Sequence, residues 1–145
     1  MSAPAQLTDE QVQQELLRLE AYRNQLNAML QQHQLLSGSL ADHRRARETL
    51  EGLESTEAGS EFVIPVGGEA YLRGSVAKDG KVLIGIGSGV VTEMDRPKAS
   101  ETLAERITRI EEARSDLESQ MAQLEERIER LSDRLDSLAR AAGGP

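Results

Sequence analysis

The sequence predicts a mainly α protein of the α+β class: a long antiparallel coiled coil of two helices with two central β-hairpins that assemble into an inter-subunit β-barrel. Three observations support this fold. Apolar residues recur at heptad spacing over both ends of the 145-residue chain. The segment between them is rich in β-branched residues and glycine and alternates with a period of two. Aromatic residues make up only 2% of the chain, so we do not expect a large globular core.

The first predicted helix runs from Thr8 to about Leu53. Thr8 and Gln11 fit a capping box, in which each side chain accepts a hydrogen bond from the other residue's backbone amide. Gly38 lies inside this helix and costs about 1 kcal/mol relative to alanine, without ending so regular a pattern. The two rows of seam residues are Val12, Leu19, Leu26, His33 and Leu40, and Tyr22, Met29, Leu36, His43 and Leu50.

The second predicted helix runs from about Lys98 to Ala141, and Pro97 fits the position at which a helix begins. Arg114 is the one residue that breaks its apolar seam. We expect Arg114, and Arg47 on the first helix, to lie along the seam with the guanidinium in water, where nearby glutamates can pair with it. The seam rows are Leu103, Ile110, Leu117, Leu124, Leu131 and Leu138, and Ile107, Met121, Ile128, Leu135 and Ala142.

The central segment predicts about four short strands, enough for two hairpins. Asp79-Gly80 is a strong hairpin signal, because this dipeptide suits tight turns between strands. The predicted order is a strand over 62–64 ended by Pro65, a turn at Gly67-Gly68, a strand over 70–76, a turn at Asp79-Gly80, a strand over 82–86, a turn at Ser88-Gly89 and a strand over 90–92.

The stretch KVLIGIGSGVVTEM, residues 81–94, raises the question of a phosphate-binding loop. A dinucleotide fingerprint needs G-x-G-x-x-G directly before a helix, whereas the spacing here is G-x-G-x-G and a β-branched run follows it. No Gly-Lys-Ser/Thr occurs in the chain, which also excludes a Walker-type loop. Glycines within strands more often mark bulges and sharp bends, so we interpret the stretch as part of an assembly element.

Two-stranded hairpins are marginal in water, and the strand over 82–86 is apolar on both faces. Its free edges also invite pairing with another chain. We therefore expect hairpins from several subunits to close into a shared β-barrel. The predicted oligomerisation residues are Phe62, Val63, Ile64, Val66, Leu72, Val82, Leu83, Ile84, Gly85, Ile86, Val90 and Val91.

The two helices flank the hairpins, so the simplest topology folds them back on each other. This register places Leu50 near Leu103, and it places Leu40 near Ala113 and Leu19 near Arg134. The predicted division of the chain is 1–54 for the first helix, 55–97 for the oligomerisation region and 98–145 for the second helix and tail.

The composition argues against several classes of function. A net charge of −8 without a basic cluster argues against nucleic-acid binding. The chain has no cysteine, and His33 and His43 are ten residues apart, so we expect no metal site. Catalysis needs groups that converge in a concave pocket, which two rods do not offer, so we expect neither an enzyme nor a cofactor. The sequence shows neither a signal peptide nor a membrane span, which favours a cytoplasmic protein.

At the level of whole motifs, the chain resembles the alpha subunits of archaeal prefoldins. The resemblance is carried by FVIPVGGEAYLRGSV and KVLIGIGSGVVTEM between two heptad helices, and two hairpins match the alpha type, because the beta type has one. It implies a hexamer of two alpha and four beta subunits with a double β-barrel base. It further implies binding of unfolded proteins without ATP and their delivery to a group II chaperonin.

The helix ends far from the hairpins are the expected contact sites for unfolded chains, because a coiled coil that ends leaves apolar residues partly uncovered. Two rival functions remain open at this point: a structural or adaptor coiled coil that oligomerises through its hairpins, and an enzyme that uses the glycine loop. The candidate contact residues are Leu7, Val12, Leu16, Leu17, Leu135 and Leu138.

Overall fold

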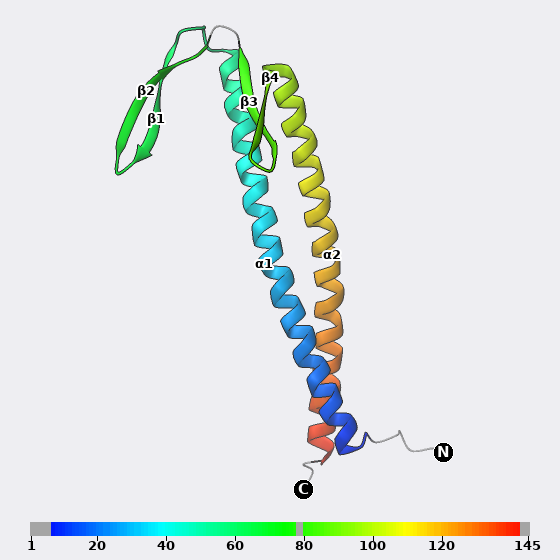
Figure 1. Cartoon of the computed structure of the whole chain (residues 1–145). Coiled ribbons are helices and arrows are strands. Elements are labelled where there is room, and N and C mark those ends of the chain that lie inside the picture. The colour runs from blue at the N-terminus through cyan, green and yellow to red at the C-terminus, as the bar shows by residue number, and fades with distance from the viewer. Residues whose placement is uncertain (1–6, 78–79, 143–145) are drawn as a thin grey trace. The chain divides into compact units, whose positions relative to one another are not determined.

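The computed structural model describes residues 7–77 and 80–142, which form two long helices and four strands (Figure 1). This confirms the predicted two-helix coiled coil with two central hairpins and the order of its elements, while the inter-subunit barrel stays a prediction. Neither helix contains, in its described residues, an apolar stretch of the length needed to cross a bilayer. The elements are α1 (Asp9–Glu54), β1 (Glu61–Gly67), β2 (Ala70–Ser75), β3 (Lys81–Gly87), β4 (Val90–Asp95) and α2 (Arg96–Ala142).

Local signals set the ends of the helices. The Thr8 amide donates to Gln11 Oε1 over 2.8 Å, and the Gln11 amide donates to Thr8 Oγ1 over 3.2 Å, so the predicted capping box is present. Arg96 Nη1 donates to the Leu53 carbonyl over 3.3 Å, which satisfies one of the free acceptors at the end of α1. The helix α2 begins at Arg96, two residues before the predicted start.

The chain divides into two compact units, each containing parts of both helices. In the unit formed by residues 7–37 and 112–142, Leu19 of α1 packs with Leu131 and Leu135 of α2. These two residues flank Arg134, so the antiparallel register predicted for this part of the seam is correct. Val12, Tyr22 and Ile128 pack at the margin of this cluster.

In the unit formed by residues 38–111, Leu50 packs with Leu103 as predicted, together with Ala99 and Ile84. Ile84 belongs to β3, and Val82 and Met94 of the same hairpin pack at the margin of this cluster. Among the described residues, Leu40 is the largest side chain that is almost fully buried, at 1% exposure.

The two hairpins are structural repeats twenty residues apart in the sequence. In the first, β1 pairs with β2 and Ile64 lies opposite Leu72; in the second, β3 pairs with β4 and Ile84 lies opposite Thr92. Both registers shift just before the turn, between Pro65 and Gly67 and between Gly85 and Gly87. The chain therefore makes two equivalent two-stranded sheets.

Positive φ angles explain why glycine occurs at the turns. Gly67 and Gly87 have φ of 106° and 110°, a region that is strained for residues with a Cβ. The next two residues of each turn also have positive φ angles, namely Gly68 and Glu69 in the first and Ser88 and Gly89 in the second. Three consecutive left-handed residues close each hairpin, so these glycines serve backbone geometry.

Two predictions about the strands are wrong. Pro65 does not end the first strand: β1 continues to Gly67, and Pro65 lies opposite Tyr71. In a two-stranded sheet every strand is an edge, where a missing amide hydrogen is tolerated. Asp79-Gly80 does not join paired strands, because β2 and β3 belong to different sheets. Residues 78–79 themselves lie outside the described residues.

Replacing Gly38 in α1 by alanine is expected to stabilise the protein. A Cβ at this position would meet nothing within 4 Å, and Gly38 does not have a positive φ, so only the entropic cost of glycine is removed. We expect the free energy of unfolding to rise by about 1 kcal/mol, measured by urea denaturation followed by circular dichroism at fixed protein concentration. Gly87→Ala is the control and should lower it. A loss of stability in Gly38→Ala would contradict the regular helix described here.

Candidate functional site

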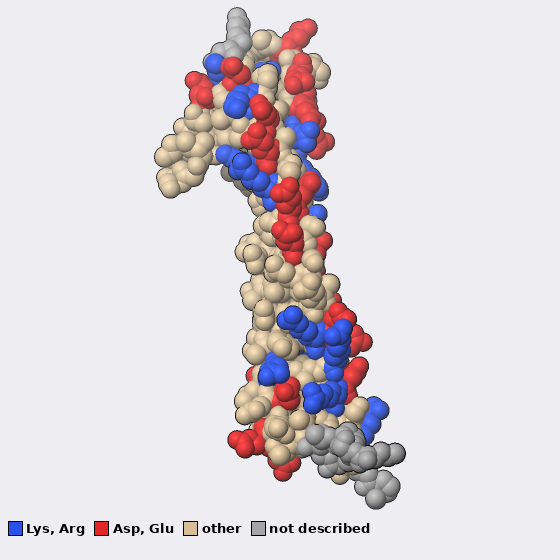
Figure 2. All heavy atoms as spheres, turned by 90° about the vertical axis from the view of Figure 1, so that its right-hand side faces the viewer, with Lys and Arg blue, Asp and Glu red and all other residues tan. Residues whose placement is uncertain are grey.

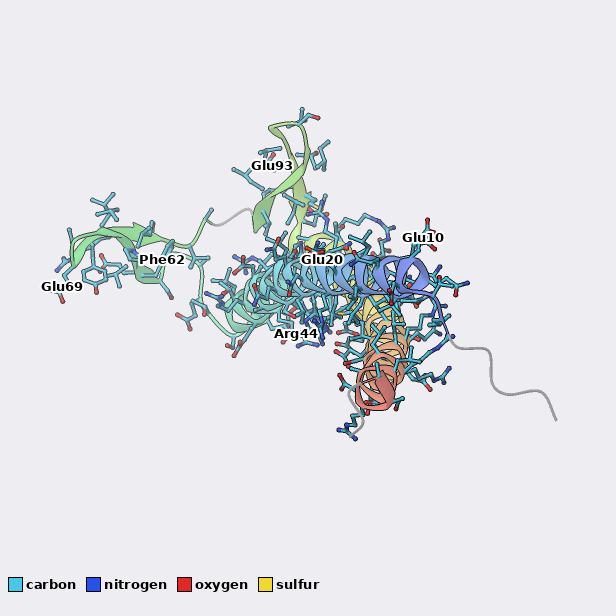
Figure 3. All side chains as sticks on the ribbon, turned by 90° about the horizontal axis from the view of Figure 1, so that it is seen from below. Glu10, Glu20, Arg44, Phe62, Glu69 and Glu93 are labelled. Carbon is cyan, nitrogen blue, oxygen red and sulfur yellow. The ribbon has the colours of Figure 1, made fainter. Side chains whose placement is uncertain are left out.

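Most of the exposed large apolar side chains among the described residues lie on the two hairpins. In Figure 3, side chains such as Phe62 on the first hairpin stand out from the ribbon. The exposed fraction of these side chains reaches 71% at Leu83, although isolated soluble domains rarely expose apolar residues in contiguous patches. We call this set the hairpin surface. It consists of Phe62, Val63, Ile64, Val66, Tyr71, Leu72, Leu83, Ile86, Val90 and Val91.

Most of the predicted oligomerisation residues belong to the hairpin surface, but Ile84 and Val82 do not. Ile84 is 7% exposed in the cluster with Leu50, and Val82 packs against the same cluster. Gly85 lies in β3 and is exposed, yet it contributes no side chain. Sequence reasoning missed Tyr71, which is 60% exposed and lies opposite Pro65. A signal was available in the sequence, because Tyr71 is a large side chain in the same predicted strand as Leu72.

The second hairpin is attached to α2 by a polar contact as well as by Ile84. Arg106 Nη2 donates to the Gly85 carbonyl over 2.6 Å. Across the hairpin, Lys81 Nζ lies 2.5 Å from Asp95 Oδ1, at paired positions of the two strands. Gly85 therefore offers a backbone carbonyl to a guanidinium. A nucleotide-binding loop would instead direct its backbone amides at a phosphate.

A cavity of about 410 Å³ lies between the end of α1 and the hairpins in the unit of residues 38–111. Its lining is mostly apolar, and none of the described residues that line it is an Asp, Glu or His. Such a lining can hold apolar side chains but offers no general base. The lining residues are Thr49, Leu53, Phe62, Ser75, Val76, Ala77, Lys81, Val82 and Arg96.

The predicted client-contact residues separate into three groups. Leu16 and Leu17 are 49% and 66% exposed. Leu135 is buried at 8% and Val12 packs beside it, as seam residues should. Leu7 and Leu138 are half-buried.

Sequence reasoning missed two further exposed leucines on α1, Leu30 and Leu35, which are 42% and 75% exposed. Leu35 follows Leu17 by five full helical turns, so the two lie on the same side of the helix. One signal was available, because residues 24–41 contain no Lys, Arg, Asp or Glu. An uncharged outer face on a coiled-coil helix is unusual, since that face normally carries charge.

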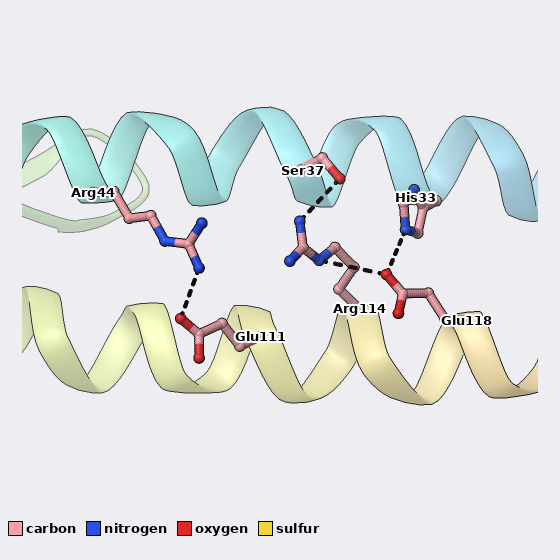
Figure 4. Close-up of polar contacts among 6 residues, drawn as sticks. All are labelled: His33, Ser37, Arg44, Glu111, Arg114 and Glu118. Atoms are coloured by element: carbon pink, nitrogen blue, oxygen red, sulfur yellow. Dashed lines mark hydrogen bonds and ion pairs between the residues drawn. The ribbon is translucent and has the colours of Figure 1, made fainter.

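Polar residues interrupt the seam near the middle of both helices (Figure 4). Arg114 Nη1 lies 3.5 Å from Ser37 Oγ, and Arg114 Nε lies 3.7 Å from Glu118 Oε1. The same carboxylate oxygen is 2.9 Å from His33 Nε2. The Arg114 side chain is 30% exposed, so the prediction that its head reaches water and a glutamate is correct. Arg47 likewise pairs with a glutamate, Glu51.

The histidines take part in structural contacts. His43 Nδ1 lies 2.7 Å from the Ser39 carbonyl, one turn earlier on α1, and His33 contacts Glu118 on α2. Within the described part of the chain there is no group of three or more His, Cys, Asp or Glu side chains suited to holding a metal ion. Polar breaks of this kind fix the register of a coiled coil at some cost in stability.

Comparisons with known proteins agree on one family. The sequence model of the Prefoldin family, described as Prefoldin subunit, matches residues 22–141. The prefoldin subunit alpha of Methanopyrus kandleri is 30% identical over 117 residues, which cover 78% of this chain and 74% of that protein. The prefoldin subunit alpha of Methanobrevibacter smithii is 29% identical over 129 residues, covering 89% and 88%.

Two solved structures share the fold. A chain of the cryo-EM structure of filamentous PFD from Methanocaldococcus jannaschii superposes with a TM-score of 0.67 at 26% identity, covering 79% of this chain and 95% of that chain. The crystal structure of the prefoldin beta subunit from Thermococcus strain KS-1 gives a TM-score of 0.60 at 25% identity, with coverage of 92% and 96%.

Removing the guanidinium that holds Gly85 should loosen the second hairpin. We expect Arg106→Met to speed amide hydrogen exchange in β3 and β4 about fivefold, because a net hydrogen bond is worth about 1 kcal/mol, while exchange in α1 stays unchanged. Exchange measured by mass spectrometry on the full chain reports this. Arg109→Met, which removes an exposed arginine one turn further along α2, is the control. Equal exchange in both variants would show that the apolar contacts of Ile84, Val82 and Met94 attach the hairpin without help from Arg106.

Proposed function

The chain belongs to the prefoldin subunit family, a family of chaperone subunits, and we propose that it is the alpha-type subunit of a holdase that binds unfolded proteins without ATP. The observation that carries the proposal is the hairpin surface, which exposes apolar side chains on both hairpins and has no cover among the described residues. A subunit built this way has a surface for assembly with other chains. The family consists of chaperone subunits and is not a family of enzymes.

The proposed assembly is a hexamer of two alpha and four beta subunits around a shared β-barrel, as the family resemblance implies. Each two-stranded sheet has free edges on both sides, and pairing with strands of other subunits satisfies them. The bulge residues Val66 and Ile86 occupy the same place in the two hairpins, so both sheets bend alike. The division into a helical part, 1–54, a hairpin part, 55–97, and a second helical part, 98–145, stays part of this proposal.

Clients are proposed to contact the apolar side chains of the unit formed by residues 7–37 and 112–142. Leu16 and Leu17 are the strongest candidates among Leu7, Val12, Leu16, Leu17, Leu135 and Leu138, because they are exposed without helping the seam. Several weak apolar contacts in one assembly raise avidity for chains of varied sequence. A group II chaperonin in the cytoplasm is the proposed recipient of these clients, and no cofactor takes part.

Charges placed on the hairpin surface should prevent assembly. We expect Leu83→Lys combined with Val91→Lys to abolish complex formation with a co-expressed beta-type subunit, because two ammonium groups would have to leave water on assembly. The mass of the purified complex, measured by native mass spectrometry, reports this. Leu30→Lys combined with Leu35→Lys is the matched control on α1. A complex of unchanged mass in the hairpin variant would contradict the proposed interface.

Exposed leucines near the start of α1 should determine holdase activity. We expect Leu16→Ser combined with Leu17→Ser to suppress aggregation of a chemically unfolded protein less than the parent complex does, measured by light scattering after dilution. Leu30→Ser combined with Leu35→Ser makes the same chemical change elsewhere on α1 and should have a smaller effect. If the parent complex suppresses no scattering at stoichiometric amounts, the protein is an adaptor coiled coil instead.

A further inference from the structure

Four arginines converge on one surface of the unit formed by residues 7–37 and 112–142. They line a shallow cavity of about 240 Å³ whose other lining residues are Glu15, Tyr22 and Leu131. Figure 2 shows basic side chains gathered in its lower part, at the height of the C-terminal half of α2 in Figure 1. We call this set the arginine cluster. It consists of Arg18, Arg127, Arg130 and Arg134.

The coiled coil itself does not account for the arginine cluster. Arg18 pairs with Glu15 over 3.4 Å, and Arg130 pairs with Glu126, in both cases within one helix. No ion pair involving Arg127 or Arg134 is found among the described residues. Four neighbouring cations repel one another, which lowers the stability of the folded state. Such a group is unexpected in a chain whose net charge is −8. The paired positions farther along the seam, Arg44 with Glu111 over 3.1 Å, show the cross-helix pairing that the cluster lacks.

We propose that the arginine cluster binds an acidic peptide segment of a partner protein. The guanidinium group presents a rigid fork of donors that matches a carboxylate, and Arg127 and Arg134 have no ion-pair partner among residues 7–77 and 80–142. Their spacing suits a chain rather than one small anion, because positions 127, 130 and 134 extend over about 10 Å along α2. An extended peptide advances about 3.4 Å per residue, so alternate carboxylates can meet successive arginines.

The floor of the cavity favours the same partner. Tyr22 is half-buried beside the Leu19–Leu131 cluster, and Leu131 is 8% exposed, so apolar groups lie between the cations. An apolar side chain between two acidic residues would contact this floor while its neighbours pair with the rim. This charge-selective contact goes beyond the proposed function, which requires only apolar contact with clients.

The test measures binding of a fluorescently labelled peptide of about twelve residues, rich in Asp and Glu around one Leu, to the full chain in its assembled complex. We expect saturable binding by fluorescence anisotropy that weakens as salt increases from about 0.05 to 0.2 M, since the contacts are exposed ion pairs. A peptide with Asn and Gln in place of the acids should not bind. Equal binding of both peptides would overturn the proposal, as would no binding of either.

Variants locate the site. Arg127→Gln combined with Arg134→Gln removes two exposed cations that form no ion pair within the described part of the chain, and should raise the dissociation constant about tenfold or more. Arg45→Gln combined with Arg109→Gln removes the same charge from the other unit and should change it less than about twofold. Similar weakening in both variants would show a general field effect and overturn the site.

Two further measurements complete the test. Equal unfolding temperatures of the two variants and the parent show that the fold is retained, as expected for exposed positions. Inorganic phosphate that displaces the peptide at micromolar concentration would identify a small-anion site and overturn the peptide proposal. Anisotropy measures peptide binding, whereas light scattering measures suppression of aggregation. A negative result in one experiment therefore does not decide the other.

Discussion

A two-stranded sheet has two faces, and the described residues of this chain cover little of either. The first hairpin exposes apolar side chains along its length, while the second is held to the helices by Ile84, by Val82 and Met94 beside it, and by the contact from Arg106 to Gly85. Burial of apolar area is the main force that favours folding, so uncovered strands of this composition are stable only with partners. The hairpin surface thus leaves the isolated chain with apolar strands that need a partner. This is consistent with its membership of a family of subunits.

The helices satisfy a different constraint, because each can bury its seam against the other. The leucine clusters at Leu50–Leu103 and Leu19–Leu131 fix the antiparallel register in both units. Between them, Arg114 breaks the apolar seam and makes its contacts with Ser37 and Glu118. An antiparallel pair of leucine-rich helices can slide by a heptad at small cost, and a polar layer that finds its partners in one register alone opposes such slippage.

The sequence was sufficient for the helices, the capping box at Thr8, the register and the turn glycines, because each follows from local spacing or backbone sterics. It was insufficient at Pro65, where the outcome depends on β1 being an edge strand, and at Ile84, which looks equivalent to Ile64 but packs on the helices. Exposure on α1 was also missed: Leu35 lies off the seam in an uncharged run, and only tertiary packing decides whether such a residue is covered.

Apolar and cationic surfaces occur close together on α1, where the exposed Leu17 directly precedes Arg18 of the arginine cluster. Aggregation-prone segments of natural proteins are usually flanked by charged residues that limit their self-association. If both proposals hold, a segment with an apolar core and acidic flanks would use both surfaces at once, and two weak contacts of different kinds would add avidity. Because the net charge of the chain is −8, a local group of four arginines offers a cationic site on a protein that does not attract polyanions over its whole surface.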